Sequence, residues 1–435
     1  MTDSERQHSR AKQLAHFRGH DLWRPSYGHW EERLFDQRLD FVQRSLSLPS
    51  SAVEESADFG RRAFQEWRGD VESDPGDYMF LVPLRMGRSS RRYTSELAHF
   101  LPVLDYLEPE LGQVLGSSLP PFAASYTNGR DGTRGAVWCT QIYPDMMSDL
   151  GGLRGAISVG REIVNEVVAR ASQRTSIKAL GLGASLPSIT KFGLAIDTDL
   201  PTTTGHGCTV ALMIQTILDR VEALDGEQSI GILGLGSIGS AVASTLAQRQ
   251  DVRRLRVFDT KHRLVDEFVR SHQFTSVDIE PAESLADLLA HSTVVASAIT
   301  STVDLDEIGS DLAGLVIIDD SQPGAFSASQ VAAAGGTLNW VIGSDDTVDS
   351  ALTRTGDFTY GAEGVTSTAD LWGCEAEVGA ISLLNRPELC LDRPVGSADI
   401  PAFTQLLQEV GVVVAQPQAF GECAPGVLPQ GAVGG

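Results

Sequence analysis

Residues 229–248, SIGILGLGSIGSAVASTLAQ, place a short apolar run, three spaced glycines and a helical pattern in one stretch. Gly234, Gly236 and Gly239 follow the spacing G-x-G-x-x-G. The first glycine permits a tight turn, the second lets backbone approach a pyrophosphate, and the third lets the helix pack on the strand. The spacing alone is a weak signal. It constrains this chain because a second apolar run, LRVF, leads directly into Asp259, twenty residues after Gly239.

These features predict a doubly wound, Rossmann-type nucleotide domain. Two further apolar runs, STVVASA and LVIIDD, continue the alternation of strands and helices. A unit of this kind that holds no nucleotide is the competing interpretation, and the coincidence of strand, turn, helix and acid argues against it. Cofactor binding is therefore assigned to the glycine turn and its neighbours: Gly234, Gly236, Ser237, Ile238, Gly239 and Ser297.

The residues that follow the second strand leave the choice of cofactor open. Asp259 would hydrogen-bond the adenine ribose diol and repel a 2′-phosphate, which favours NADH. Lys261 and Arg263 come directly afterwards and would hold that phosphate instead, which favours NADPH. We therefore expect NAD(P)H to be the cofactor, with Asp259 tipping the balance slightly toward NADH.

Length, charge and cysteine content limit the remaining possibilities. A chain of 435 residues is too long for one ordinary domain, and its net charge of −23 argues against a nucleic-acid partner. The chain has no run of eighteen apolar residues, so we expect no membrane span. The N-terminal MTDSERQHSRAKQLAHFRGH has no apolar core, so we expect no signal peptide. The five cysteines form no CxxC pair, and we expect a cytoplasmic protein with reduced thiols and no metal site.

Composition and periodicity divide the rest of the chain. Residues 1–75 predict a helical extension, residues 76–205 a substrate domain, residues 206–365 the nucleotide domain, residues 366–420 C-terminal helices and residues 421–435 a disordered tail. The predicted fold class is α/β. It combines a Rossmann-type doubly wound nucleotide domain with an α/β substrate domain and C-terminal helices.

Two cysteines near predicted helix starts are candidate nucleophiles. A helix N-terminus lowers the pKa of a thiol, and both Cys208 in TTTGHGCTV and Cys374 in LWGCEAEVG occupy such positions. Each is alternatively a small core residue, and periodicity alone favours this for Cys374, which shares a helix face with Val378 and Ile381. Glu377 lies on the same face. An ionised Glu377 would raise the thiol pKa, so it is better suited to donate a proton or to orient a neighbour.

A series of motifs spans roughly residues 130 to 420 in the order GAVWCTQIYPDMM, IKALGLGASLPSIT, TTTGHGCTVA, GSIGSAVASTLA, VVASA, IIDDSQP and GCEAEVGAISL. Together they resemble the long-chain fatty acyl-[acyl-carrier-protein] reductases of the cyanobacterial type. Those enzymes reduce an acyl thioester to an aldehyde with NADPH, through a cysteine in a Cys-x-Ala-Glu motif. The resemblance implies that Cys374 accepts the acyl group from an acyl carrier protein or coenzyme A thioester.

This chemistry needs donors for the oxyanion that forms at each carbonyl addition. The catalytic residues are then Cys374, Glu377 and His206. Candidate substrate or oxyanion residues are Thr203, Thr204 and Gly205.

The chain also departs from that family. Its nucleotide turn is GLGSIG rather than G-A-T-G-x-x-G, and residues 203–206 read Thr-Thr-Gly-His where the family has Thr-Thr-Gly-Asn. Residues 319–324 lose the lysine of an Asp-Gly-Gly-Tyr-Pro-Lys segment, and NRPELCLDRPVG replaces an aromatic-rich one. Two alternatives remain. One is a dehydrogenase of the shikimate dehydrogenase type with direct hydride transfer, and the other is a non-catalytic nicotinamide-binding regulator.

A dense basic cluster, RMGRSSRRY, offers a docking site for an acidic carrier protein. A solvated loop is the alternative for such a charge run. The arginines concerned are Arg85, Arg88, Arg91 and Arg92.

Overall fold

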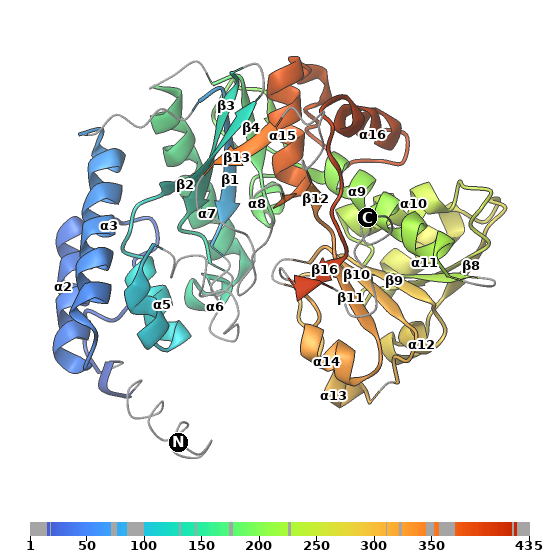
Figure 1. Cartoon of the computed structure of the whole chain (residues 1–435), viewed down its shortest axis with the longest axis horizontal. Coiled ribbons are helices and arrows are strands. Elements are labelled where there is room, and N and C mark those ends of the chain that lie inside the picture. Colours follow the sequence, from blue (N-terminus) through green and yellow to red (C-terminus); the bar gives the residue numbers. More distant parts are fainter. Residues whose placement is uncertain are drawn as a thin grey trace, which may run out of the picture. The chain divides into compact units, whose positions relative to one another are not determined.

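The chain forms two compact units in this computed structural model (Figure 1). The first contains Met1–Thr127, Arg134–Leu200 and Thr355–Glu363, and the second contains Asn128–Thr133, Pro201–Arg354 and Gly364–Gly435. The structure describes residues 15–17, 19–70, 76–84, 100–129, 132–143, 146–173, 177–224, 228–309, 311–321, 324–344, 352–355, 370–419 and 422–423.

The first unit contains a sheet whose central strands are buried. β1 pairs in parallel with β3 on one side and with β4 on the other, and β2 lies beside β3. All four residues of β4 are buried, as expected for a parallel sheet covered on both faces. In sheet order these strands are β2 (Phe122–Gly129), β3 (Arg134–Thr140), β1 (Tyr78–Pro83) and β4 (Ala179–Leu182).

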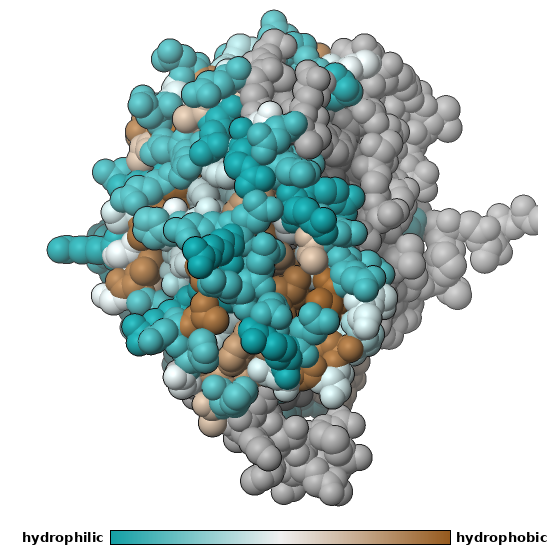
Figure 2. Space-filling view, turned by 90° about the vertical axis from the view of Figure 1, so that its left-hand side faces the viewer, coloured by the Kyte–Doolittle hydropathy of each residue, from teal (hydrophilic) through white to brown (hydrophobic). Residues whose placement is uncertain are grey.

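Amphipathic helices supply the rest of the first unit, including the part predicted as an N-terminal extension. The outer face of α2 and α3 is mostly hydrophilic, with small separated apolar areas of the kind found on many protein surfaces (Figure 2). The helices are α2 (Glu32–Ser45), α3 (Ser50–Arg68), η1 (Pro102–Tyr106), α5 (Pro109–Gly116), α6 (Met146–Asp149), α7 (Leu153–Ser172) and α8 (Leu186–Ile189).

A buried arginine fixes α2 within this unit. Arg38 is only 2% exposed, and its guanidinium donates hydrogen bonds to the carbonyls of Leu22 at 2.9 Å, Val114 at 2.7 Å and Arg24. Burial lowers the pKa of Arg38 to about 10. The carbonyls compensate for the desolvation of a charge that has no buried carboxylate beside it among the described residues. Arg38 thus ties the residues before α2 to α5.

The second unit contains the predicted nucleotide domain, and the predicted fold class is confirmed. Its main sheet is parallel in the order β11-β10-β9-β6-β7-β8, so β6 lies at the point where the chain order reverses. This order is that of Rossmann-type dinucleotide-binding sheets. The strands are β6 (Ser229–Leu233), β7 (Arg254–Phe258), β8 (Asp278–Pro281), β9 (Val294–Ser297), β10 (Val316–Asp319) and β11 (Thr337–Trp340).

Helices cover both faces of this sheet, with α10 and α11 on one face and α12 to α14 toward the other (Figure 1). α9 packs against α10, α15 and α16. Among the described residues, none of the helices is long and apolar enough to cross a membrane. The helices are α9 (His206–Glu222), α10 (Ser237–Leu246), α11 (His262–Ser271), α12 (Leu285–Ala290), α13 (Leu305–Ile308), α14 (Ala328–Ala333), α15 (Gly373–Leu384), η2 (Pro387–Leu389) and α16 (Ile400–Glu409).

Short strands complete the described chain. β12 pairs antiparallel with β14 and with β15, and β16 pairs antiparallel with β17. Their bounds are β5 (Thr202–Thr203), β12 (Gly343–Ser344), β13 (Leu352–Thr355), β14 (Asp370–Leu371), β15 (Val413–Val414), β16 (Gln418–Ala419) and β17 (Glu422–Cys423).

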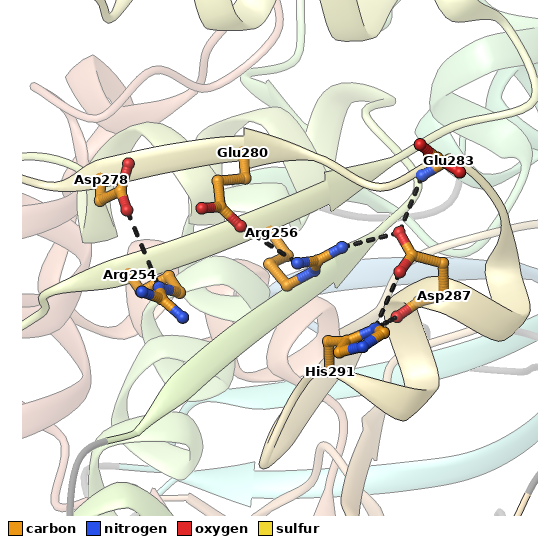
Figure 3. Close-up of polar contacts among 7 residues, drawn as sticks. All are labelled: Arg254, Arg256, Asp278, Glu280, Glu283, Asp287 and His291. Carbon is orange, nitrogen blue, oxygen red and sulfur yellow. Dashed lines mark hydrogen bonds and ion pairs between the residues drawn. The ribbon is translucent and has the colours of Figure 1, made fainter.

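An ion-pair network holds the outer edge of the nucleotide sheet (Figure 3). Arg256 on β7 contacts Glu280 on β8 at 3.0 Å and Asp287 on α12 at 2.7 Å, and its side chain is 13% exposed. Asp287 also accepts a hydrogen bond from the backbone N–H of Glu283 and contacts His291. The Glu283 N–H, followed by Arg256, holds the pKa of Asp287 below its usual value. The network therefore joins β7, β8 and α12 at this edge of the sheet.

Candidate active site

The glycine turn between β6 and α10 has the geometry that its spacing predicts. Gly234 has φ +92°, and a Cβ there would lie 2.6 Å from the side chain of Ile299. A Cβ on Gly239 would lie 1.9 Å from the Gly234 carbonyl oxygen, whereas a Cβ on Gly236 would meet nothing within 4 Å. Gly234 and Gly239 therefore make the turn and its packing possible. Gly236 leaves an open approach at the N-terminus of α10, where a pyrophosphate would bind.

Asp259 lies beside this turn. Its carboxylate accepts hydrogen bonds from the backbone N–H groups of Leu235 and Lys261, both at 2.8 Å. Each carboxylate oxygen can accept further bonds, so a ribose hydroxyl remains a possible partner. Arg263 pairs with Glu267 at 2.6 Å on the exposed face of α11, and Lys261 is exposed. The carboxylate is thus fixed at the turn, and the two cations lie on the surface after it.

Replacing Asp259 with asparagine tests which cofactor this arrangement prefers. Asparagine keeps one oxygen acceptor for the turn but removes the charge that repels a 2′-phosphate. We expect the ratio of kcat/KM for NADPH over NADH to rise about tenfold, which corresponds to ~1.4 kcal/mol. Asp266→Asn, on the exposed face of α11, makes the same charge change away from the turn and serves as the control. An unchanged ratio in Asp259→Asn would show that Asp259 does not face the ribose.

The start of α9 contacts both the glycine turn and the candidate nucleophile. Gly205 has φ +72°, and a Cβ there would lie 2.1 Å from the Cβ of Cys374. A Cβ on Gly373 would similarly lie 2.7 Å from the Cα of Thr209. On the other side, Nδ1 of His206 lies 3.1 Å from Oγ of Ser237, the first residue of α10. One helix start therefore bridges the cofactor turn and Cys374.

Glu377 caps the N-terminus of α9 from a neighbouring helix. It is 1% exposed and accepts hydrogen bonds from the N–H groups of Gly205 at 3.0 Å and Cys208 at 2.7 Å, and from the hydroxyl of Thr203. These groups would otherwise have no partner within α9. Burial raises the pKa of Glu377 to about 7, and these hydrogen bonds oppose the rise. Because both carboxylate oxygens are engaged in the cap, the geometry favours the orienting role over the proton-donor role.

This raised pKa predicts a pH-dependent stability. Between the ordinary pKa of 4.5 and the folded-state pKa of about 7, folded Glu377 binds more protons than unfolded Glu377. Its contribution to the free energy of unfolding should therefore fall as the pH rises through this window, by about 1.4 kcal/mol for each unit of pKa shift. Urea unfolding of the wild type and of Glu377→Gln, which cannot ionise, should show a difference that changes only there. A constant difference would contradict the shift.

Cys374 is the second residue of α15 and is partly exposed. Burial raises the pKa of its thiol, and the charges of Asp320, Glu375 and Glu377 raise it further. The helix start alone predicts a lower pKa, and that prediction is wrong here because burial and three carboxylates outweigh the dipole. Cys208 is fully buried, and burial followed by Glu377 raises its pKa. Cys208 is therefore a core residue, which was the alternative to a nucleophile considered for it from the sequence.

The other predicted site residues do not contact Cys374 in any described interaction. Thr204 accepts a weak hydrogen bond, at 3.4 Å, from the N–H of His206. Burial lowers the pKa of His206 to about 4, so its imidazole is neutral at physiological pH. Ser297 is fully buried, with its hydroxyl 3.2 Å from that of Ser321. Ile238 is a partly buried residue of the first turn of α10. The cluster Arg85, Arg88, Arg91 and Arg92 lies outside the described residues, as do Gln322 and Pro323.

Asp320 was not among the residues predicted from the sequence, and its charge raises the pKa of the Cys374 thiol. It follows β10 at the carboxyl edge of the sheet. The available signal was the pair of acids at the end of LVIIDD, because ligands bind at the carboxyl ends of such strands. Among the described residues, no group of three or more His, Cys, Asp or Glu side chains could hold a metal ion.

Part of the parallel sheet of the second unit matches a known nucleotide-binding family. Residues 230–308, from β6 into α13, match the family model described as the saccharopine dehydrogenase NADP binding domain. These residues form a nicotinamide-nucleotide domain. Together, the match and the fold support an NAD(P)-dependent oxidoreductase and leave NADH and NADPH unresolved. No curated protein sequence matches the chain.

Solved structures give only distant similarity. A reductive aminase from Aspergillus terreus is 16% identical, with 27% of this chain and 41% of the aminase covered and a TM-score of 0.21. Dipicolinate synthase A chain from Bacillus subtilis is 14% identical, with 37% and 56% covered and a TM-score of 0.27. L-tryptophan dehydrogenase from Nostoc punctiforme is 13% identical, with 62% and 71% covered and a TM-score of 0.31. The chain thus spans less than two thirds of the aminase and of the synthase.

Proposed function

We propose that the protein reduces an acyl thioester to an aldehyde with NAD(P)H, through an acyl group carried on Cys374. One observation supports this most. Gly205 lies against Cys374, and the next residue, His206, contacts Ser237 in the cofactor turn. The candidate nucleophile and the nucleotide turn are therefore held by two consecutive residues of one helix start. A cysteine that served only the core would not need this proximity.

The chemistry proceeds through covalent capture. The sulfur of Cys374 attacks the thioester carbonyl carbon, and the thiol of coenzyme A or of an acyl carrier protein leaves. NAD(P)H, held by the glycine turn and Asp259, would supply the hydride for the reduction of the acyl-cysteine to a hemithioacetal. This species collapses to the aldehyde and the free Cys374 thiol. Splitting the substitution from the reduction replaces one difficult step with two easier ones.

The imidazole of His206 is neutral, so it can position a neighbouring group by hydrogen bonding but cannot stabilise a negative charge as a cation. A neutral ring donates one hydrogen bond and accepts another. With Ser237 on one side, His206 orients the start of α10 toward the cofactor phosphates. Glu377 holds the start of α9 in place through its hydrogen bonds to the N–H groups of Gly205 and Cys208. This keeps Gly205 against the thiol of Cys374.

Intact-mass spectrometry tests the proposal. The protein is incubated with acyl-coenzyme A thioesters of different chain length and with the matching acyl-pantetheine thioesters, without NAD(P)H. A mass increase equal to the acyl group, lost on addition of NAD(P)H with release of aldehyde, is the expected result. NAD(P)H oxidation without an adduct would favour direct hydride transfer of the shikimate dehydrogenase kind. No oxidation with any thioester would favour a nicotinamide-binding regulator.

A further inference from the structure

We propose that His206 is a positioning residue for the cofactor: its Nδ1–H group donates to Oγ of Ser237 and turns the Ser237 hydroxyl proton toward the pyrophosphate. The proposal goes beyond the thioester chemistry, because it depends only on nicotinamide-nucleotide binding at the glycine turn. It assigns a proton to one ring nitrogen and a direction to one hydroxyl, which the positions of the heavy atoms alone leave open.

Ser237 is the first residue of α10 and directly follows the open position at Gly236. The N–H of Ser240 donates to the Gly236 carbonyl at 2.9 Å, which is the first backbone hydrogen bond of the helix. The N–H groups of Ser237, Ile238 and Gly239 therefore have no acceptor within α10, and such groups bind the pyrophosphate in nucleotide turns of this kind. The Ser237 hydroxyl belongs to the first of these residues and lies at the same helix start.

His206 contacts this hydroxyl from the buried side. Nδ1 of His206 lies 3.1 Å from Oγ of Ser237. His206 is 8% exposed, whereas Ser237 is partly exposed. Among the residues that the structure describes, His206 is the one hydrogen-bond partner of the Ser237 side chain. The hydroxyl therefore has a buried ring on one side and the open turn on the other.

The donors and acceptors of this pair can be counted. Burial lowers the pKa of His206 to about 4, so near neutral pH the ring carries one N–H. Without a cofactor, either the hydroxyl or the ring can supply the proton of their hydrogen bond. A pyrophosphate only accepts hydrogen bonds, so the Ser237 hydroxyl must donate to it. Oγ then accepts from the ring, which requires the proton on Nδ1 and leaves Nε2 as an acceptor.

Cofactor binding is therefore expected to select one tautomer of His206. The N–H group at Nδ1 holds Oγ of Ser237 in place and directs the single hydroxyl proton away from the ring. A hydroxyl that the ring already holds loses less side-chain freedom when it binds a phosphate. His206 thus contributes to cofactor affinity without touching the cofactor.

Nitrogen NMR of histidine-labelled protein reads the tautomer directly, because protonated and unprotonated ring nitrogens have different chemical shifts. The probe is ADP-ribose, which contains the pyrophosphate but no nicotinamide. Adenosine, which contains no phosphate, is the control and should leave the spectrum of the free protein unchanged. With ADP-ribose, the His206 signals, assigned by their absence from His206→Asn, should show a protonated Nδ1 and an unprotonated Nε2. An unprotonated Nδ1 in the bound state overturns the proposal.

Fluorescence titration with NAD(P)H measures the energetic effect of the same contact. Ser237→Ala should weaken binding by about tenfold to 100-fold, the usual effect of losing one hydrogen bond to a charged group. His206→Leu should weaken binding by about threefold to tenfold. His206→Asn, whose side-chain amide can donate from a similar position, should restore most of this loss. Ser244→Ala removes a hydroxyl two turns further along α10 and should bind like the wild type.

The double variant Ser237→Ala/His206→Leu separates positioning from general damage to the turn. If His206 acts only through the Ser237 hydroxyl, the double variant should bind no more weakly than Ser237→Ala alone. Losses that multiply would overturn the positioning role, as would full affinity in His206→Leu. None of these measurements uses a thioester. Failure of the wild type to bind NAD(P)H or ADP-ribose would overturn this proposal, whereas absence of an acyl adduct alone would overturn only the proposed function.

Discussion

Replacement of Cys374 with serine is expected to abolish acyl-adduct formation and aldehyde production, with a loss of roughly 10,000-fold or more, as for loss of other covalent nucleophiles. A hydroxyl ionises far less readily than a thiol, and an acyl-serine ester accepts hydride less readily than an acyl-cysteine thioester. The substitution is nearly isosteric, so the contact with Gly205 should survive. Nucleotide binding at Gly234 to Gly239 should therefore persist, which fluorescence titration with NAD(P)H checks.

A second cysteine supplies the matched control. Cys390 is partly exposed, and burial followed by the charges of Glu377 and Glu388 raises its pKa to about 12. It lies after η2 rather than at the start of a helix that contacts α9, so Cys390→Ser should retain adduct formation. A full-strength adduct on Cys374→Ser would refute the nucleophile assignment, and Cys208 would be the next thiol to test.

Replacement of Glu377 with leucine should destabilise the second unit by about 3 kcal/mol or more, because it leaves three buried polar groups without their hydrogen-bond acceptor. Leucine has a similar volume but no acceptor, so the N–H groups of Gly205 and Cys208 and the hydroxyl of Thr203 lose their partner. Each buried polar group without a hydrogen bond costs about 1 to 3 kcal/mol. Urea unfolding followed by fluorescence should show a lower midpoint.

Glutamine at the same position is the control for this loss. Its carbonyl oxygen can still accept from Gly205 and Thr203, but its NH₂ group cannot accept from Cys208. Glu377→Gln should therefore lie between the wild type and Glu377→Leu. Equal stability of the leucine variant and the wild type would mean that Glu377 does not cap α9 in solution.

The nucleotide unit could be predicted because its signals are local. The turn at Gly234 to Gly239, the strands on either side and the acid at Asp259 lie within about thirty residues, the scale of one βαβ unit. Each predicted strand of this unit occurs where the apolar runs placed it, and α9 begins at His206, close to the helix start predicted near Cys208. Hydrophobic periodicity and glycine spacing determine such elements almost independently of the rest of the chain.

The organisation around Cys374 could not be predicted in the same way. Glu377 meets its partners across 169 to 174 residues of chain, and no spacing rule encodes contacts over that separation. The Cys-x-Ala-Glu motif suggested a pair that works on one substrate. In the structure the glutamate caps another helix, and an acid that also raises the thiol pKa, Asp320, comes from the end of a strand. The pKa of a buried group depends on neighbours from other elements. The direction of the Cys374 pKa shift therefore could not be predicted without the structure.

The contact between Gly205 and Cys374 also bears on how substrate choice and reactivity can evolve. Two main chains meet there without intervening side chains, so backbone geometry rather than rotamer choice sets the separation of the thiol from the cofactor turn. A methyl group at Gly205 or at Gly373 would force the helix starts apart. Single substitutions at this contact therefore cannot change the separation of the two helix starts by small amounts. Adaptation to longer, shorter or more polar acyl chains is therefore expected to accumulate at residues that touch the chain itself, while the reacting distance stays constant.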